Sequence, residues 1–569
     1  MTKTFQVEPH SGSLQIASKA WSDFGAHIPL IRSFSYGTNN PPESPLFPGE
    51  PIRYHFLFYM MVGLGERLGV RIDHSLNLLS SAGFTLMLVM LYAMGKTIFE
   101  RRLTGLFAVI LTLFNGSLSF LAFFRTHPIS LSTPIDILTN TTFPSFGPWD
   151  GSVISAFWTM NIFTNQRHLG LSYGLIFILI YIGIRTQPRI YTQFSLPVIA
   201  TVLTVYAPSV VRALLIAIII SVLFFLNQAA LAIVGIVFTW LFLLVPKARG
   251  TIIIAAIATL PAYILWTQIT ASSGLPAWSP GYLMVHPISV YTFIEYWWMN
   301  LGLHMICIPI GMIIAPRPAK KLFIVPLILL FTIANLYRLS PDMINNHKFF
   351  NFILIIGSLF SATVLTKLVD SLHRTKADNT IDPAREISSN TTHPKPAYHF
   401  QDTPIYRVLT GLLGIGLFGI LTLSGIIDLP PIFNDHVYTV DDRSNPDVKA
   451  FVSLTKPGDI ILNSTFFYNP ASLAGRPIFF GYSYFTWSYG YEQTARERVF
   501  LDLWRTSDKM AACNTLVSNN IRFIALSDYA ESSILPHTVF WNTEFIRIYR
   551  NDTSGLSIFS VEKSCKYHE

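Results

Sequence analysis

Long apolar stretches, separated by short polar ones, fill most of this chain. They cover about 74–95, 103–124, 170–186, 251–269, 296–315, 321–338, 347–370 and 406–427, and a longer stretch covers 194–245. Because an apolar α-helix of roughly 20 residues crosses a bilayer, each stretch predicts a membrane span. Pro197 and Pro208 flank a segment too short to cross, so we predict a re-entrant or broken half-helix at 194–207. The pattern predicts a mainly α-helical, polytopic membrane bundle of about nine or ten spans.

The pattern changes after the last apolar stretch, where apolar runs become short. Helical periodicity favours helices at 447–454 and 495–504, and short alternating runs favour strands at 459–463, 478–480, 522–526 and 545–549. Residues 429–569 are therefore predicted to form a small α/β domain. A polar insert at 371–405, rich in Asp, Asn, Thr and Pro, predicts a flexible linker before the last span at 406–428.

The first 70 residues differ from the membrane domain predicted at 71–370. Residues 1–20 are polar and contain no signal peptide. Apolar residues then recur at helical spacing on both sides of a loop that holds five prolines between 41 and 51. We predict two short amphipathic helices that lie on the membrane surface, joined by this loop. Asp23 and His27 are four residues apart and share one face of the first helix.

Composition supports a membrane protein and limits its partners. Of the 569 residues, 51% are hydrophobic and only 13% are charged. The formal net charge of +8 fits basic cytoplasmic loops or an anionic lipid partner, and no basic run suggests nucleic acid. The three cysteines are widely separated in sequence, so we predict neither a disulfide framework nor a metal cluster.

Basic residues recur in alternate loops between the predicted spans. They are Lys96, Arg101, Arg102, Arg185, Arg189, Arg317, Lys320 and Lys321, with more between 367 and 376. Lys and Arg are enriched in cytoplasmic loops, so these loops and the 371–405 linker are expected inside the cell. The loops at 23–70, 125–169, 270–295 and 339–348 and the C-terminal domain then lie on the outer, extracytoplasmic side.

Three basic side chains on the outer side suggest a phosphate site. Arg167, His168 and Lys348 would form a cationic pocket at the level of the lipid headgroups, and we expect Arg167 and Lys348 to lie at an exposed mouth. The alternative is that they anchor helix ends by reaching to phospholipid headgroups. Asp23 and His27 could likewise be a helix cap and a surface histidine. Two such ligands do not make a metal site.

Several short motifs resemble the C-type (GT-C) membrane glycosyltransferases, in particular bacterial members that use polyprenyl-phosphate-linked sugars. The motifs are Trp21-Ser22-Asp23 with His27, Asn40-Pro41-Pro42-Glu43, Tyr54-His55-Phe56, Gln166-Arg167-His168-Leu169, Asn345-Asn346-His347-Lys348-Phe349-Phe350, Gly475-Arg476 and Trp487-Ser488-Tyr489-Gly490. The chain departs from the family in two ways. Residues 1–20 offer no counterpart of the family's first span, and a lone Asp23 replaces a paired acidic motif. The second departure leaves a divalent-metal requirement open.

The resemblance implies an enzyme that moves a sugar from a polyprenyl-phosphate donor to a glycan, lipid or protein acceptor, with inversion at the sugar. Asp23 would act as general base with His27 beside it. The substrate-binding residues would be Glu43, Tyr54, His55, Gln166, Arg167, His168, Asn346, His347 and Lys348. Two other classes stay open, a transporter or flippase of lipid-linked glycans and a non-catalytic membrane scaffold. A transporter would need polar residues deep in its spans, where this chain has few.

Overall fold

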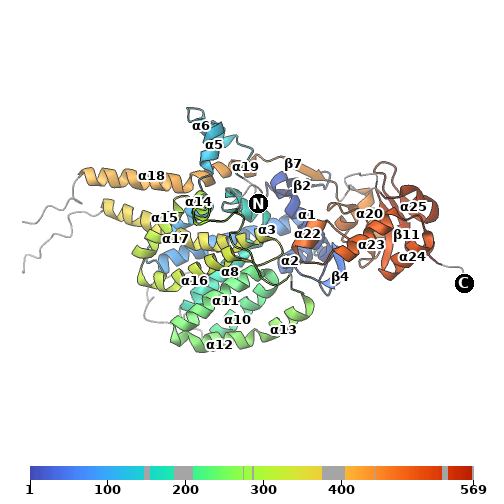
Figure 1. The fold of residues 1–569 in the computed structure, drawn as a ribbon, viewed down its shortest axis with the longest axis horizontal. Coiled ribbons are helices and arrows are strands. Elements are labelled where there is room, and N and C mark those ends of the chain that lie inside the picture. The colour runs from blue at the N-terminus through green and yellow to red at the C-terminus, as the bar shows by residue number, and fades with distance from the viewer. Residues whose placement is uncertain are drawn as a thin grey trace, which may run out of the picture.

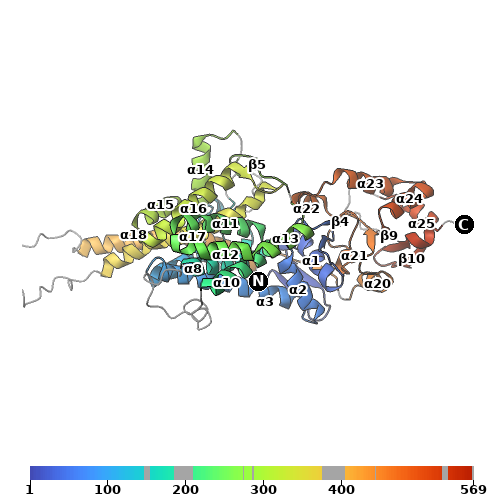
Figure 2. The ribbon, with the colours of Figure 1, turned by 90° about the horizontal axis from the view of Figure 1, so that it is seen from below.

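The computed structural model describes residues 1–145, 154–184, 209–272, 274–284, 287–373, 404–442, 444–527 and 536–566. The half-helix predicted at 194–207 and residues 374–403, most of the predicted linker, lie outside the described residues. A helix bundle forms one end of the molecule and a mixed α/β domain forms the other (Figure 1). The first helices of the chain lie between these two parts (Figure 2).

Apolar helices build the bundle. They are α3 (Ile72–Thr97), α4 (Arg102–Leu113), α8 (Leu169–Ile184), α10 (Ser209–Leu226), α11 (Gln228–Leu244), α12 (Arg249–Ala258), α13 (Leu260–Ile269), α14 (Val290–Leu301), α15 (His304–Ile314), α16 (Arg317–Leu336), α17 (His347–His373) and α18 (Pro404–Asp428). The helix α17 lies at the centre of the bundle. In the span Met343–Leu372, which contains most of α17, 72% of the apolar 18-residue stretch is buried, against 11% in the span Pro246–Ile269. The prediction of a mainly α-helical membrane bundle with a small α/β domain is confirmed.

The number of spans depends on the shorter helices. Among the described residues, five helices are long and apolar enough to cross a membrane, and the bent pair α14 and α15 would make a sixth. Four shorter apolar helices, α4, α8, α10 and α11, would bring the number to ten. However, the 12 residues of α4 rise only about 18 Å, well short of the roughly 30 Å hydrocarbon core. The predicted nine or ten spans therefore stay a prediction.

Two predicted spans have a different shape. The stretch 103–124 is not one helix, because α4 ends at Leu113 and the short α5 (Phe120–Thr126) follows after a turn. The stretch 296–315 bends by 85° between α14 and α15. Gly302 occupies this bend with φ +53°, and a Cβ there would lie 2.9 Å from the carbonyl oxygen of Gly116. The backbone conformation and the close approach both favour glycine at the bend.

Short elements connect the bundle helices. They are α6 (Thr133–Leu138), α7 (Asn161–Asn165), the 3-10 helices Ser155–Phe157, Pro246–Ala248 and Met343–Asn346, and the paired strands β5 (Ala277–Trp278) and β6 (Tyr337–Arg338). The last of these 3-10 helices leads directly into α17, so it helps position the start of the central helix. A further 3-10 helix, Ser18–Ala20, lies in the N-terminal region.

The N-terminal region is built into the fold. The leader forms β1 (Phe5–Val7) and β2 (Leu14–Ala17), and β2 pairs antiparallel with β7 (Val437–Val440), which follows α18 and α19 (Pro430–Phe433). The helix α1 (Trp21–Ser35) is not on the membrane surface as predicted, since every residue from Phe24 to Ser35 is buried. It packs against α2 (Leu57–Arg67) and α21 (Pro470–Leu473). The proline-rich loop between α1 and α2 contains the strand pair β3 (Glu43–Ser44) and β4 (Phe47–Pro51).

The C-terminal domain has a four-stranded sheet in the order β10-β11-β9-β8. Its strands are β8 (Ile460–Leu462), β9 (Ile521–Leu526), β10 (Arg547–Arg550) and β11 (Ser557–Ser560), and its helices are α20 (Pro446–Leu454), α22 (Ser483–Ser488), α23 (Thr494–Arg505), α24 (Lys509–Ser518), α25 (Thr538–Glu544) and α26 (Val561–Ser564). Only the pair β8 and β9 is parallel. The predicted helices and three of the predicted strands are present, whereas Ile478 makes an isolated bridge rather than a strand.

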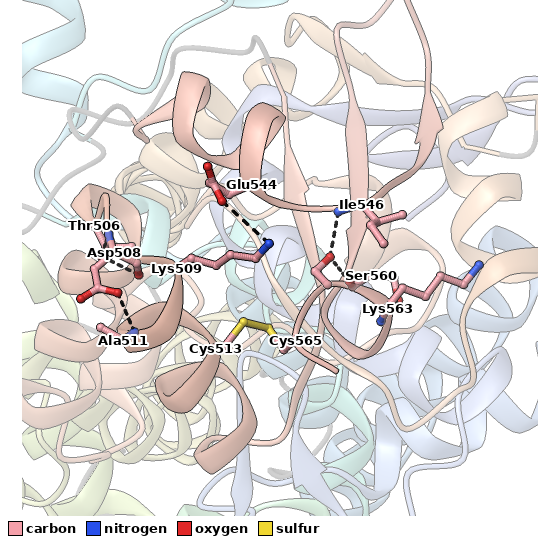
Figure 3. Close-up of a disulfide and its surroundings, with 11 residues drawn as sticks. Thr506, Asp508, Lys509, Ala511, Cys513, Glu544, Ile546, Ser560, Lys563 and Cys565 are labelled. Atoms are coloured by element: carbon pink, nitrogen blue, oxygen red, sulfur yellow. Dashed lines mark hydrogen bonds and ion pairs between the residues drawn. A yellow bond between two sulfur atoms is a disulfide. The ribbon is translucent and has the colours of Figure 1, made fainter. Parts of the chain in front are cut away.

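A disulfide joins Cys513 of α24 to Cys565, which follows α26. Our prediction of no disulfide is therefore wrong. The two residues are separated by 52 positions in sequence, yet their Cα atoms lie 5.5 Å apart. Figure 3 shows the bond between the two chain segments, close to Lys509 and Ser560. It links the last helix of the domain to the helix that precedes β9.

Candidate functional site

A cavity of about 730 Å³ lies where α1, α11, α17 and α22 meet. Its polar lining includes Lys19, Asp23, His27, Arg53, Tyr54, His55, Gln166, Asp342, Asn345, Asn346, His347, Lys348, Tyr484, Ser488 and Tyr489. Its apolar lining includes Ala229, Ala232, Ile236, Ile333 and Phe349. The cavity thus joins the bundle, the N-terminal helices and the C-terminal domain.

Asp23 lies in the first turn of α1 and reaches the cavity. Its Oδ1 accepts a hydrogen bond of 3.1 Å from Nε2 of Gln166. Burial raises the pKa of Asp23 to about 6, although the Lys348 cation and the hydrogen bond from Gln166 act in the opposite direction. A carboxyl group with a pKa close to the working pH is suited to accept a proton.

His27 lies one turn after Asp23 and is held by Tyr59 of α2. The His27 Nε2 and the Tyr59 hydroxyl are 2.7 Å apart, and the two rings stack with centroids 4.5 Å apart. Burial, with the nearby cations Arg167 and Lys348, lowers the pKa of His27 to about 3. His27 is therefore neutral at physiological pH and is a poor base. Its position favours a role in shaping the wall beside Asp23.

Lys348 is the second residue of α17, and 7% of its surface is exposed. Its Nζ donates a hydrogen bond of 3.2 Å to the neutral Oδ1 of Asn345. The other two basic residues that line the cavity form ion pairs, Lys19 with Asp435 at 3.0 Å and Arg53 with Glu50 at 3.1 Å. Within the described part of the chain, no carboxylate lies within 4.0 Å of the Lys348 ammonium group.

Arg167 lies behind the cavity wall and not at an exposed mouth, so our expectation for its position is wrong. Its side chain is 1% exposed. The guanidinium group donates hydrogen bonds to the backbone oxygens of Thr164 and Met1, to Oδ1 of Asn77 and to Oγ1 of Thr4. These contacts occupy the guanidinium group, which joins the leader to α3.

The other predicted site residues divide into two groups. Tyr54, His55, Gln166, Asn346 and His347 line the cavity together with Asp23, His27 and Lys348. His168 does not line it, because its ring is fully buried behind His55, with centroids 4.0 Å apart. Glu43 is also outside the lining, and its carboxylate accepts a 2.8 Å hydrogen bond from the backbone N–H of Gly49 in the proline-rich loop.

The C-terminal domain supplies part of the cavity wall that sequence reasoning did not assign. The Tyr484 hydroxyl of α22 donates a 2.7 Å hydrogen bond to Oδ2 of Asp342, just before α17. Tyr489 stacks on Tyr54 with ring centroids 4.4 Å apart. In the sequence, the motif around Ser488 and Tyr489 pointed to this wall. The contacts themselves could not be predicted, because each joins segments more than a hundred residues apart.

Metal ligands do not gather at this site. Across the residues that the structure describes, no group of three or more His, Cys, Asp or Glu side chains could hold a metal ion. The cavity offers two carboxylates, Asp23 and Asp342, of which Asp342 already accepts the Tyr484 hydroxyl. It also offers the Lys348 ammonium group, two ion-paired cations and several neutral donors and acceptors.

Neither a protein-family model nor a curated protein sequence matches this chain. Among solved structures, it is similar to ArnT from Cupriavidus metallidurans bound to undecaprenyl phosphate, at 11% identity over 96% of this chain and 95% of that chain, with a TM-score of 0.46. It is also similar to the archaeal oligosaccharyltransferase AglB from Archaeoglobus fulgidus in complex with an inhibitory peptide and a dolichol-phosphate. That match has 11% identity over 97% of this chain and 71% of that chain, with a TM-score of 0.39. Identities and TM-scores this low do not identify a function.

Proposed function

We propose that this protein is a C-type membrane glycosyltransferase that moves a sugar from a polyprenyl-phosphate donor to an acceptor at the outer face of the cell membrane. The supporting observation is that one cavity combines an apolar groove, an unpaired lysine and a carboxylate of raised pKa. These three features match the lipid tail, the phosphate and the acceptor hydroxyl of such a reaction. The resemblance of the cavity-lining motifs to the family supports the same function.

The groove suits an apolar lipid tail. Ala229, Ala232 and Ile236 lie on one face of α11, at spacings of three and four residues, and Ile333 of α16 lines the same cavity. The two alanines leave space beside the helix that a larger side chain would fill. The polyprenyl chain would lie along this face and continue between the helices into the bilayer.

Lys348 is placed to bind the donor phosphate. A cation in the first turn of a helix meets the positive end of the helix dipole, which is unfavourable unless an anion is also bound there. Lys348 is in this position on α17, and its hydrogen-bond partner among the described residues is the neutral Asn345. The carboxylates of Asp23 and Asp342 act on it only from beyond 4.0 Å, so a bound anion could still come closer. A phosphate group would interact favourably with both the ammonium group and the helix N-terminus. The Lys348 ammonium group would also stabilise the negative charge that develops on the phosphate as the sugar–phosphate bond breaks.

Asp23 is placed to accept the proton of the acceptor. The acceptor hydroxyl oxygen would attack the anomeric carbon while the bond from that carbon to the phosphate oxygen breaks. The electron pair leaves with polyprenyl phosphate, which Lys348 stabilises, and the hydroxyl proton passes to the Asp23 carboxylate. A single displacement of this kind inverts the configuration of the sugar. Gln166 would hold the carboxylate in place through its 3.1 Å hydrogen bond.

The disulfide supports an extracytoplasmic C-terminal domain. Disulfides persist in oxidising compartments and are rare in the cytosol, and Cys513–Cys565 lies in this domain. The end of α17 and the start of α18 lie at the opposite end of the bundle from the domain (Figure 1). Basic residues in alternate loops, such as Arg102 and Lys321, suggest that this opposite end is cytoplasmic. The cavity would then face the outer side.

Lipid analysis in a deletion strain tests this proposal. We expect a polyprenyl-phosphate sugar to accumulate when the gene is deleted, and to stay high when the strain is complemented with Asp23→Asn. Complementation with the unsubstituted gene should restore its normal level. Incubating the accumulated lipid with purified protein in detergent micelles then separates an enzyme from a transporter, because micelles have no two sides. Release of free polyprenyl phosphate in the presence of cell-envelope acceptor supports the enzyme, and an unchanged lipid contradicts it.

A further inference from the structure

A short helical arm stands away from the bundle beside α18 (Figure 1). It consists of α5 and α6 with the connection between them, residues 120–138. Its apolar side chains are unusually exposed: Leu121 at 42%, Ile129 at 80%, Leu131 at 101%, Ile135 at 62% and Leu138 at 69%. Soluble surfaces rarely gather so many exposed large apolar side chains in one short segment.

Both ends of the arm are fixed to the same end of one spanning helix. The backbone N–H of Phe120 donates a 3.2 Å hydrogen bond to Oγ of Ser424, which is four residues before the end of α18 at Asp428. At the other end, Nδ2 of Asn434 donates hydrogen bonds to the carbonyl oxygens of Leu138 and Asn140, at 2.8 and 3.1 Å. Ser424 lies only about 6 Å from the helix end along its axis. The arm is therefore held close to the end of α18 that leads into the C-terminal domain.

Apolar side chains are also exposed on α18 and α19 near the arm. On α18, Ile420 and Ile426 are 40% and 41% exposed, and Phe433 of the following α19 is 54% exposed. In Figure 1 the arm stands at the junction of α18 and α19 and points sideways, away from the direction of α18. A segment with exposed apolar side chains near the end of a spanning helix can lie in the interface, with those side chains among the lipid acyl chains.

We infer that residues 120–138 are an interfacial arm whose apolar side chains insert into the bilayer leaflet on the side of the C-terminal domain. The polar groups of the arm fit this position. Arg125 and His127 are exposed near the turn between the two helices and can reach lipid headgroups. Asp136 is partly buried, and its Oδ2 accepts a 2.9 Å hydrogen bond from Oγ of Ser132. The arm would fix the depth and the rotation of the bundle in the membrane.

Spin labelling of the full chain in lipid nanodiscs tests this inference. A nitroxide on Leu131→Cys is compared with one on Val539→Cys, an apolar position that is 67% exposed on α25 of the C-terminal domain. The native cysteines should not take up the label, because Cys307 is buried and the other two form the disulfide. We expect the ratio of collisions with lipid-soluble oxygen to collisions with a water-soluble nickel chelate to be several-fold higher at position 131.

Two results would overturn the inference. Equal ratios at both positions would mean that the arm lies in water. A label at position 131 that collides with neither reagent would mean that protein, such as a second copy of the chain, covers the arm. As a second measure, Leu131→Ser and Ile135→Ser are combined in one variant. Its binding of donor and acceptor should be unchanged. Its thermal stability should be lower in nanodiscs and unchanged in detergent. Equal loss in both media would point to a contact within the protein.

Discussion

Replacing Lys348 by Met should weaken the binding of undecaprenyl phosphate while it changes the stability of the free protein little. Hydrogen bonds to charged groups contribute about 1.5–3 kcal/mol, and 1.4 kcal/mol is tenfold in affinity, so undecaprenyl phosphate should bind about 10- to 150-fold more weakly. The free protein should change by only about 1 kcal/mol. The lost hydrogen bond to Asn345 and the lost attraction to Asp23 and Asp342, which lie beyond 4.0 Å, are partly offset when a cation leaves the helix N-terminus. Lys348→Arg keeps the charge and should keep most of the affinity.

The assay is a titration of purified protein with undecaprenyl phosphate in detergent, followed by intrinsic tryptophan fluorescence, with thermal unfolding measured on the same samples. Lys321→Met is the matched control. Lys321 is an exposed lysine near the start of the spanning helix α16, and it lies 12 residues before the cavity-lining Ile333. Undiminished affinity in Lys348→Met would refute the phosphate assignment and favour the headgroup-anchoring role. Weak binding in the control as well would mean that the assay reports general attraction to cations.

Three other outcomes are expected. Arg167→Met should lower the free energy of unfolding by about 3 kcal/mol or more, because several buried oxygens lose their donor; normal thermal unfolding would contradict the structural role. A membrane-impermeant thiol reagent should label Val539→Cys and not Arg102→Cys in intact cells, and labelling of both or of Arg102→Cys alone would reverse or reject the orientation. The base must be ionised, and the pKa of Asp23 is raised to about 6. We therefore expect kcat/KM to be constant above this pH and to fall about tenfold per pH unit below it. A flat profile down to pH 4.5 would mean that Asp23 is not the base.

The bundle could be predicted because membrane helices carry their signal locally. Most apolar stretches became helices near their predicted bounds, as α3, α16 and α17 show. The bend at Gly302 could not be predicted, since it depends on the approach of Gly116, which is distant in sequence. The sheet that joins β2 to β7 also escaped prediction, because its strands are short and lie more than 400 residues apart.

The site was predicted only in part, because some of its residues are placed by local spacing and others only by tertiary packing. Asp23 and His27 share a helix face, so local spacing places both on the cavity. Arg167 and Lys348 are equally basic in the sequence, and only tertiary packing shows that the first is enclosed by Thr4 and Asn77. The disulfide was missed because a separation in sequence does not reveal how close two cysteines come after folding.

Turnover by Asp23→Asn decides whether this carboxylate is the catalytic base. The substrate is the lipid-linked sugar extracted from the deletion strain, and release of polyprenyl phosphate is followed with purified protein. Asparagine keeps the shape of the side chain but cannot accept the proton, so turnover should fall by about 10²–10⁴-fold while undecaprenyl phosphate still binds. Glu43→Gln, at a carboxylate outside the cavity lining, should leave turnover intact. Near-normal turnover in Asp23→Asn with loss in Glu43→Gln would contradict a base at Asp23 and move it to the proline-rich loop.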